Sequence, residues 1–168
     1  MADTSRLPFP DGYFDVITCC SVLEYVPHRM LRAVQRELDR VLRQGGVIVV
    51  TGTSNRLWPK EVHSRRWLVN YLPRPLDRWF TSDTRERGAL PWQIRRGFGA
   101  HYENLDRTDR GRAYLDAKRA AGDGGAKRAV FAAANRLLLA AGLSIGLATP
   151  SISVRLRKRA SAPGDGSR

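Results

Sequence analysis

Two titratable side chains and one amide follow the apolar run Val47–Thr51 and could face a substrate: Asn55, Glu61 and His63. An imidazole has a pKa of about 6.5, so His63 could accept a proton from a hydroxyl or an amine at neutral pH. His63 and Glu61 are therefore the candidate catalytic residues. A structural role for His63 stays open as the alternative.

The chain has two cysteines, Cys19 and Cys20, which are adjacent. They can form neither a disulfide framework nor a four-ligand zinc site, which excludes a small oxidised secreted scaffold. Neighbours in a strand point to opposite faces, and buried free cysteines behave as small hydrophobic residues, so we expect neither a catalytic thiol nor a metal site. The polar segment Met1–Arg6 carries Asp3 and resembles no signal peptide, which predicts a cytoplasmic protein.

The first third of the sequence has the pattern of a β–α–β unit. Phe14–Cys20 is a short apolar run, typical of a strand buried on both faces. His28–Arg43 has apolar residues on one face of a helix, and Gln44–Gly46 ends it with glycines. Val47–Thr51 is a second apolar strand. We therefore expect an α/β fold with a parallel sheet covered by helices on both faces.

The middle of the chain is irregular. Asn55–Pro91 contains four prolines and three tryptophans (Trp58, Trp67 and Trp79), and Trp92 follows directly. Short helices are plausible over residues 60–71 and 76–80. A long irregular segment inside a compact domain is usually functional, often a lid or a substrate loop. We expect the tryptophans to form the core of this insertion, and aromatic walls around an apolar acceptor are the alternative.

The last third contains two further helices and a strand. Helices are expected over residues 111–121 and 127–141, with a flexible glycine-rich break between them. Ile152–Arg157 alternates strictly, which predicts a strand with one face on the core. Leu143–Leu147 is expected to pair with it as an antiparallel hairpin at the edge of the sheet. The uncharged stretch Leu137–Val154 is near the lower limit for a membrane span, but a helix-to-strand break explains it better.

The excess of positive over negative charge lies entirely in the part of the chain after residue 54. The whole sequence has 29 basic and 16 acidic residues, a net charge of +13. Residues 1–54 hold six of each kind, so the whole excess lies in the remaining 114 residues. Such a field attracts phosphates of nucleic acid, anionic lipid or a charged substrate. A merely solvated surface is the alternative, and the lack of an RNP, zinc-finger or P-loop pattern disfavours nucleic acid.

Three motifs occur in order near the start of the chain: LPFPDGYFDVI at Leu7–Ile17, SVLEYV at Ser21–Val26 and ELDRVLRQGG at Glu37–Gly46. Together they resemble the class I S-adenosylmethionine-dependent methyltransferases, and most closely the methyltransferase type 11 group. Members of that group read L-P-F-x-D-x-x-F-D-V, an L-E-H-like stretch and R-V-L-x-P-G-G. The likeness covers residues 2–52, and the NRLWPKEVH run at Asn55–His63 resembles a subset of these enzymes.

The resemblance implies a Rossmann-like sheet of seven strands with a reversed last strand. Phe14–Cys20 would be the fourth strand, Val47–Thr51 the fifth and Ile152–Leu156 the seventh. It also implies S-adenosylmethionine as the cofactor, with Asp3 accepting a hydrogen bond from the adenine amino group. The other cofactor-binding residues implied by the resemblance are Thr4, Cys20, Ser21 and Val22.

The sequence departs from the family pattern at one important point. In the family, a glycine-rich loop and an acidic residue that holds the ribose both precede the stretch matched by Asp3, and no G-x-G-x-G occurs in this sequence. The likeness is therefore to the C-terminal half of the domain, without the first three strands. The fourth strand would then expose an unpaired edge, which favours self-association.

These observations predict four segments. Residues 1–53 would be the C-terminal part of the cofactor-binding core, 54–126 a substrate-side insertion, 127–159 the final helix and edge strands, and 160–168 a disordered tail. The predicted function is methyl transfer from S-adenosylmethionine to a small or lipid-like acceptor, by an incomplete domain. Two alternatives are an inactive remnant or adaptor that completes its sheet with a partner chain, and a basic protein that binds membranes peripherally or nucleic acid.

Overall fold

A computed structural model of the chain describes residues 6–60, 67–71, 88–122 and 124–160. The expected helix over residues 76–80 and nearly all of the expected tail lie outside these ranges. The division of the chain into four segments stays a prediction.

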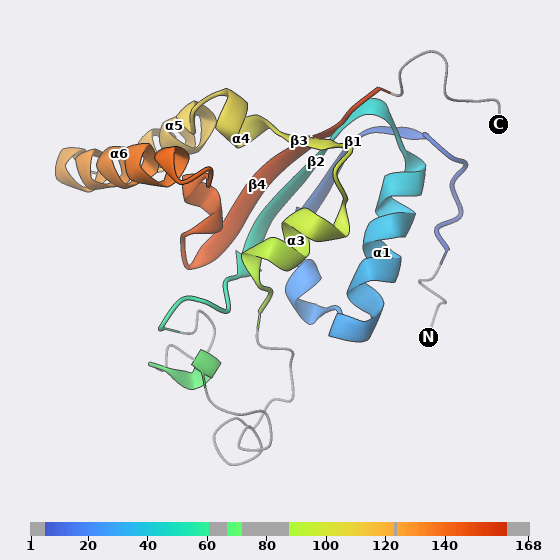
Figure 1. The fold of residues 1–168 in the computed structure, drawn as a ribbon, viewed down its shortest axis with the longest axis horizontal. Coiled ribbons are helices and arrows are strands. Elements are labelled where there is room, and N and C mark those ends of the chain that lie inside the picture. The colour runs from blue at the N-terminus through green and yellow to red at the C-terminus, as the bar shows by residue number, and fades with distance from the viewer. Residues whose placement is uncertain (1–5, 61–66, 72–87, 123, 161–168) are drawn as a thin grey trace.

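The described residues contain a mixed sheet of four strands (Figure 1). The strands are β1 (Phe14–Cys20), β2 (Leu42–Ser54), β3 (Tyr102–Asn104) and β4 (Ser151–Lys158). Their order is β1-β2-β4-β3, with β1 parallel to β2, and β4 antiparallel to both β2 and β3. The predicted α/β class and the parallel pairing of the first two strands are therefore confirmed.

Helices connect these strands. They are η1 (Leu23–Tyr25), α1 (His28–Val41), η2 (Val69–Tyr71), α3 (Pro91–Gly97), α4 (Leu105–Thr108), α5 (Arg112–Ala120), α6 (Gly125–Ala140) and η4 (Ile145–Leu147). Figure 1 shows α1 and α3 side by side in front of the sheet, whereas α5 and α6 project from its β3–β4 side.

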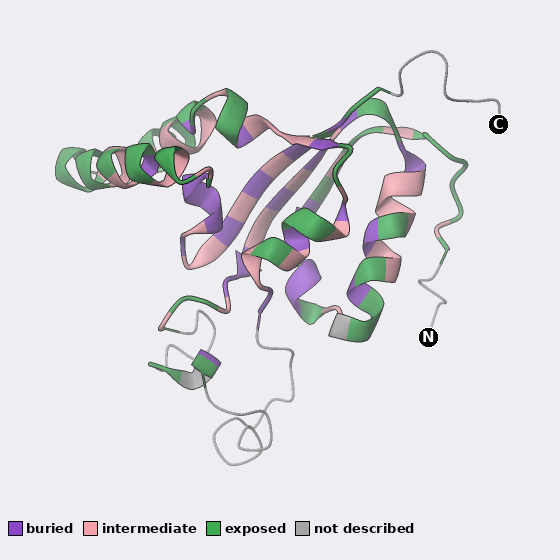
Figure 2. Cartoon of the chain, viewed as in Figure 1, coloured by how far each residue is buried: buried purple, intermediate pink, exposed green. Residues whose placement is uncertain are grey.

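The core lies between the sheet and the pair α1 and α3. Ile48 on β2 and Ile152 on β4 are fully buried, and Leu31 of α1 and Ile94 of α3 join the same cluster. The strict alternation of β4 explains this arrangement, because Ile152, Val154 and Leu156 are buried while the residues between them are not (Figure 2). The predicted one-sided burial of this strand is confirmed.

The expectation that β1 is buried on both faces is wrong. Cys19 is buried on the α1 side, but Val16 is 56% exposed, and Thr18 and Cys20 are also exposed. Within the described ranges no helix covers this face, and β1 pairs only with β2. The apolar sequence of β1 shows that the strand could be buried on both faces. It does not show whether another element covers each face.

The first helix ends earlier than its glycines suggest. α1 stops at Val41, and β2 begins directly at Leu42, before Gly45 and Gly46. Gly45 has φ +76° and lies in an irregular stretch of pairing, where β1 opposes Leu42 at one position and Val47 at the next paired position. These glycines therefore shape a bulge in the strand rather than a helix cap.

The expected hairpin between Leu143–Leu147 and the last strand is wrong. Residues 145–147 form the 3-10 helix η4, and β4 pairs with β2 and β3 instead, so β4 is not an edge. Gly146 is pressed against the strand, where a Cβ would lie 1.9 Å from the Ser153 carbonyl oxygen. Residues 145–147 therefore pack closely against β4 without pairing with it as a strand.

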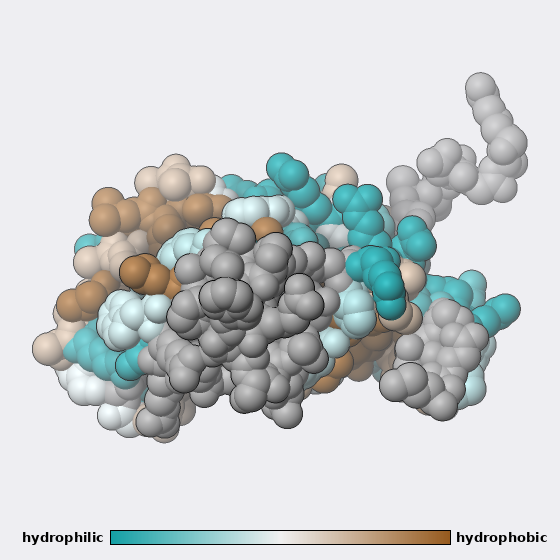
Figure 3. Space-filling model, turned by 90° about the horizontal axis from the view of Figure 1, so that it is seen from below, coloured by the Kyte–Doolittle hydropathy of each residue, from teal (hydrophilic) through white to brown (hydrophobic). Residues whose placement is uncertain are grey.

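α6 ends at Ala140, followed by Gly142 with φ +75°, and β4 begins at Ser151. The uncharged stretch thus contains a helix-to-strand break, as predicted. Within the described ranges, every helix is too short or too polar to cross a membrane. α6 does leave apolar side chains in solvent, with Val130 69% and Leu137 75% exposed. Seen from below, apolar surface extends over the left-hand end of the molecule, where the helix pair projects (Figure 3).

The described part of residues 60–71 is not the expected helix. Lys60 and Trp67 form an isolated antiparallel bridge, and residues 69–71 form the 3-10 turn η2. The Leu68 N–H donates a hydrogen bond to the Pro59 carbonyl at 2.6 Å. This bond joins the described residues before and after positions 61–66.

Candidate functional site

The carboxyl ends of the parallel strands β1 and β2 meet at one edge of the sheet, the place where open α/β sheets bind ligands. Cys20 lies opposite Thr51 there. The Ser21 N–H donates to the Thr51 carbonyl at 2.9 Å, and its hydroxyl donates to the Gly52 carbonyl at 3.3 Å. We call residues 20–22 and 51–54 the strand-end crevice.

The backbone conformation at this turn requires a glycine at position 52. Ser21 has φ +51° and Gly52 has φ +72°, both in the left-handed region. A Cβ on Gly52 would lie 2.3 Å from the Ser21 hydroxyl oxygen. Only glycine therefore allows the two strand ends to approach this closely.

The three residues of the crevice that were expected to bind the cofactor are accessible. Cys20 and Val22 are exposed, Val22 by 50%, and Ser21 is half-buried. The Val22 N–H has no hydrogen-bond acceptor within the described part of the chain, as expected just before η1. The structure thus brings Cys20, Ser21 and Val22 together at a surface that a ligand can reach.

Cys19 behaves as predicted. The residue is buried in the core cluster, and burial raises the pKa of its thiol to about 11. The thiolate is therefore not formed at neutral pH, and Cys19 packs as a small hydrophobic residue.

Glu24 is a site residue that the sequence analysis did not single out. It is 2% exposed, and its carboxylate accepts a hydrogen bond from the Ser54 N–H. This bond connects η1 to the end of β2 across the crevice. The available signal was an acidic residue inside the apolar stretch Ser21–Val26, where burial requires a specific partner.

Asn55 was expected to be able to face a substrate, and this is wrong. It is 2% exposed, and its amide donates to the Leu147 carbonyl at 3.1 Å and the Thr149 carbonyl at 2.8 Å. Its Oδ1 accepts from the Leu57 N–H at 3.0 Å. The side chain therefore joins the end of β2 to the loop before β4, which fixes the backbone below the crevice.

The other predicted site residues, Asp3, Thr4, Glu61 and His63, lie outside the described residues, so their roles stay predictions. Trp79 lies outside them as well.

The described tryptophans do not form a core. Trp58 is 36%, Trp67 65% and Trp92 44% exposed, which corrects the expectation of a packed aromatic insertion. Trp58 is held by its backbone, since its carbonyl accepts from the Asn70 amide at 2.8 Å. Lys60 Nζ lies 5.8 Å from the centre of the Trp67 ring, within cation–π range. The aromatic surfaces are thus left available on the outside of the segment.

Residues 1–50 match the family described as "Methyltransferase domain". The chain is also similar to the ubiquinone/menaquinone biosynthesis C-methyltransferase UbiE of several bacteria. The protein of Cupriavidus metallidurans is 29% identical over 92 residues, which are 55% of this chain and 30% of that protein. The protein of Neisseria meningitidis serogroup C is 36% identical over 61 residues, 36% of this chain and 24% of that protein.

The resemblance to the class I S-adenosylmethionine-dependent methyltransferases is confirmed. The Chromobacterium violaceum protein of the same name is 38% identical over 58 residues, 34% of this chain and 22% of that protein. The chain thus spans 30% or less of the length of these methyltransferase relatives.

Two solved structures align over most of the chain. The [4+2]-cyclase SpnF gives a TM-score of 0.44 at 21% identity, covering 95% of this chain and 56% of that protein. The YcgJ protein of Bacillus subtilis gives a TM-score of 0.46 at 18% identity, covering 94% and 69% respectively.

Proposed function

We propose that the chain takes part in methyl transfer from S-adenosylmethionine to a small or lipid-like acceptor. The observation that carries this proposal is the strand-end crevice. Its β1 side lies within the residues that match the methyltransferase family, and Ser21 is half-buried and Val22 exposed there. The antiparallel β4 beside β2 also agrees with the reversed last strand of a Rossmann-like methyltransferase sheet.

The residues of the crevice fit a ligand that is recognised by backbone contacts. The Val22 N–H donates to no described residue, and the left-handed turn at Ser21 brings the chain close to the end of β2. When bound, the cofactor would supply a methyl group on a positively charged sulfur. Alignment of the acceptor atom with that methyl group provides most of the rate for a reactive nucleophile, so the crevice serves mainly to position the two reactants.

The proposed role of Glu24 is to position neighbouring residues. Its bond to the Ser54 N–H holds η1 against β2, which fixes the direction of Ser21 and Val22. His63 and Glu61 remain the proposed groups for accepting a proton from the acceptor.

The proposed acceptor class rests on two observations. The relatives named above are C-methyltransferases of ubiquinone and menaquinone biosynthesis. In this chain, the segment after β2 exposes Trp58 and Trp67, which offer aromatic surface to an apolar molecule.

A titration of the isotope-labelled chain with S-adenosylhomocysteine, followed by backbone amide NMR shifts, tests the proposal. No G-x-G-x-G occurs in this sequence, so we expect weaker binding than in the family's glycine-loop-containing members. The amides of residues 20–22 and 51–54 should shift, and saturable shifts should be lost in Gly52→Ala, whose Cβ would collide with Ser21. Gly124→Ala is the matched control, because a Cβ there meets nothing within 4 Å. Absence of saturable shifts at the crevice in the unaltered chain would refute the proposal.

A second candidate function is an adaptor that completes its sheet with another copy or a partner chain. It is favoured by the free edge of β1 within the described residues and by the 56% exposure of Val16. Sedimentation velocity tests it: the chain should associate with rising concentration, and Val16→Lys should shift it toward the monomer. A chain that stays monomeric at every concentration would exclude self-association.

A further inference from the structure

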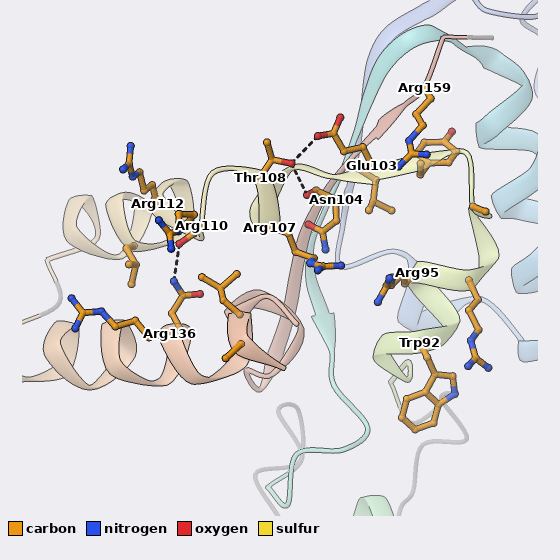
Figure 4. A pocket seen from close by; sticks show the side chains of 18 of the residues that line it. Trp92, Arg95, Glu103, Asn104, Arg107, Thr108, Arg110, Arg112, Arg136 and Arg159 are labelled. Carbon is orange, nitrogen blue, oxygen red and sulfur yellow. Dashed lines mark hydrogen bonds between the residues drawn. The ribbon is translucent and has the colours of Figure 1, made fainter. Parts of the chain in front are cut away.

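A large cleft lies on the β3–β4 side of the sheet. It has a volume of about 1540 Å³ and is bounded by α3, β3, α4, α5 and α6 (Figure 4). β3 pairs with the last residues of β4, which lie opposite the beginning of β2 rather than its end. None of residues 20–22 and 51–54 lines the cleft, so it is separate from the proposed cofactor site.

Seven arginines dominate the lining of this cleft, and we call it the arginine cleft. They come from four separate parts of the chain: Arg95 and Arg96 of α3, Arg107, Arg110 and Arg112 of the α4–α5 region, Arg136 of α6, and Arg159 after β4. In Figure 4, Arg95 and Arg107 point toward the same central space, while Arg110, Arg112 and Arg136 lie around its α5–α6 end. The positive charge is thus spread along the cleft rather than gathered at one point.

These arginines are held by a defined backbone. Arg110 and Gly111 have φ +57° and +74°, which makes the sharp turn between α4 and α5. The buried Asn135 of α6 donates from Nδ2 to the Arg110 carbonyl at 2.8 Å and packs against Gly111. A Cβ on Gly111 would lie 2.6 Å from the Asn135 amide oxygen, so the turn fits closely against α6. The arginines on this turn are therefore presented from a fixed position.

The described residues do not neutralise the charge of the cleft. Among the described residues that line the cleft, Glu103 is the one acidic residue, and its carboxylate accepts a hydrogen bond from the Thr108 hydroxyl at 2.7 Å. None of the seven guanidinium groups forms an ion pair with a described residue. By contrast, Arg40 is bound to Glu37 and Asp11, and Arg155 to Asp106 and Asp109.

We propose that the arginine cleft binds a ligand that carries two or more phosphate groups. Guanidinium groups stay charged at every physiological pH and bind phosphate oxygens in a bidentate manner, so several of them along one cleft match several phosphates. The volume exceeds the roughly 300–1,000 Å³ of ordinary small-ligand pockets, which leaves room for such an extended ligand. Like charges at this density repel one another, and an anionic ligand would relieve that repulsion.

Two sources of this chemistry can be separated by experiment. Inorganic tripolyphosphate is the probe for a free ligand. Vesicles of phosphatidylcholine with one quarter phosphatidylglycerol are the probe for lipid headgroups, with pure phosphatidylcholine vesicles as their blank. The exposed Val130 and Leu137 of α6 would contact the lipid in the second case, so Leu137→Glu should weaken vesicle binding and leave tripolyphosphate binding unchanged.

The decisive comparison uses two triple variants of equal charge. Arg95→Gln/Arg107→Gln/Arg110→Gln removes three guanidinium groups of the cleft, and Arg29→Gln/Arg32→Gln/Arg36→Gln removes three exposed ones from α1. We expect the cleft variant to lower the affinity for tripolyphosphate or for the anionic vesicles by about tenfold or more, and the α1 variant by less than about threefold.

Thermal unfolding of both variants shows whether each still folds. The proposal is overturned if neither probe binds the unaltered chain, or if both variants lose affinity equally, because the effect would then reflect net charge alone. Binding of a mixed-sequence oligonucleotide with unchanged affinity in the cleft variant would also argue against this site as the source of phosphate recognition.

Discussion

The two sides of α4 carry charges in opposite situations. Asp106 is buried and accepts hydrogen bonds from the Arg155 N–H at 2.8 Å and Nε at 2.7 Å, while Asp109 also binds this guanidinium. Arg107, the next residue after Asp106, lines the arginine cleft and has no ion-pair partner in the described part of the chain. Charges that hold the fold together are paired here, and the unpaired ones stand in a cleft.

A second paired cluster supports the same contrast. Lys158 at the end of β4 donates to the backbone carbonyls of Asp39 at 2.7 Å and Leu42 at 3.2 Å. Tyr102 donates its hydroxyl to the Asp39 carboxylate at 2.7 Å, and His101 lies 3.1 Å from the same oxygen. Burial would raise the pKa of Asp39, but these hydrogen bonds outweigh it and lower that pKa. The cluster therefore joins α1 to the β3–β4 edge.

The largest effect is expected where a buried pair is broken. Asp106→Asn leaves the half-buried Arg155 without its main carboxylate, and we expect a loss of about 3 kcal/mol in the free energy of unfolding. Urea unfolding followed by circular dichroism measures it. Asp116→Asn on the exposed side of α5 is the control, with an expected change below about 0.5 kcal/mol. Equal losses of unfolding free energy in both variants would mean that the ion pair at Asp106 contributes no more to stability than the exposed charge of Asp116.

Acidification should remove the stability contributed by the paired carboxylate of Glu37 over a defined range of pH. Hydrogen bonds from Arg40 and from the Leu7 N–H lower the pKa of Glu37 from 4.5 to about 2. A carboxylate with a lowered pKa stabilises the folded state above its unfolded pKa, so this contribution is lost as the pH falls from about 4.5 toward 2. Unfolding followed at several pH values should show this decline, and Glu37→Gln should make it shallower. A variant with an unchanged pH dependence would rule out this role of Glu37.

The smallest effect, with the opposite sign, is expected in the arginine cleft. Arg110→Gln removes one of several repelling charges and breaks no ion pair with a described residue. We expect a gain in unfolding free energy of a few tenths of a kcal/mol at low salt, which disappears at high salt because the repulsion is screened. A loss above 1 kcal/mol would show that Arg110 is a structural residue and would remove the contrast with Asp106.

Sequence reasoning was most effective where local pattern and tertiary packing agree. The alternation of Ile152, Val154 and Leu156 predicted a half-buried strand, and the apolar runs around Ile17 and Ile48 predicted parallel neighbours. It was less effective where coverage depends on distant segments. Tyr102–Asn104 has three residues, too few for a periodic signal, and the exposed side of β1 is set by what packs on it.

The candidate site could likewise be predicted from local motifs only in part. The family motifs identified Ser21 and Val22 at the strand end, but the full engagement of Asn55 depends on carbonyls more than 90 residues away. The charge excess after residue 54 was countable from the sequence. Its concentration in one cleft was not, because Arg95 and Arg136 are brought together only by the folding of four separate segments.

The most direct test of the whole account places both proposed ligands on one isotope-labelled sample. The chain is first saturated with tripolyphosphate, and S-adenosylhomocysteine is then added while backbone amide shifts are recorded. The account predicts that tripolyphosphate shifts residues around Arg107 and Arg110, and that S-adenosylhomocysteine then shifts residues 20–22 and 51–54 as it does without tripolyphosphate. Displacement of one ligand by the other, or shifts of both in a single region, would contradict the existence of two separate sites.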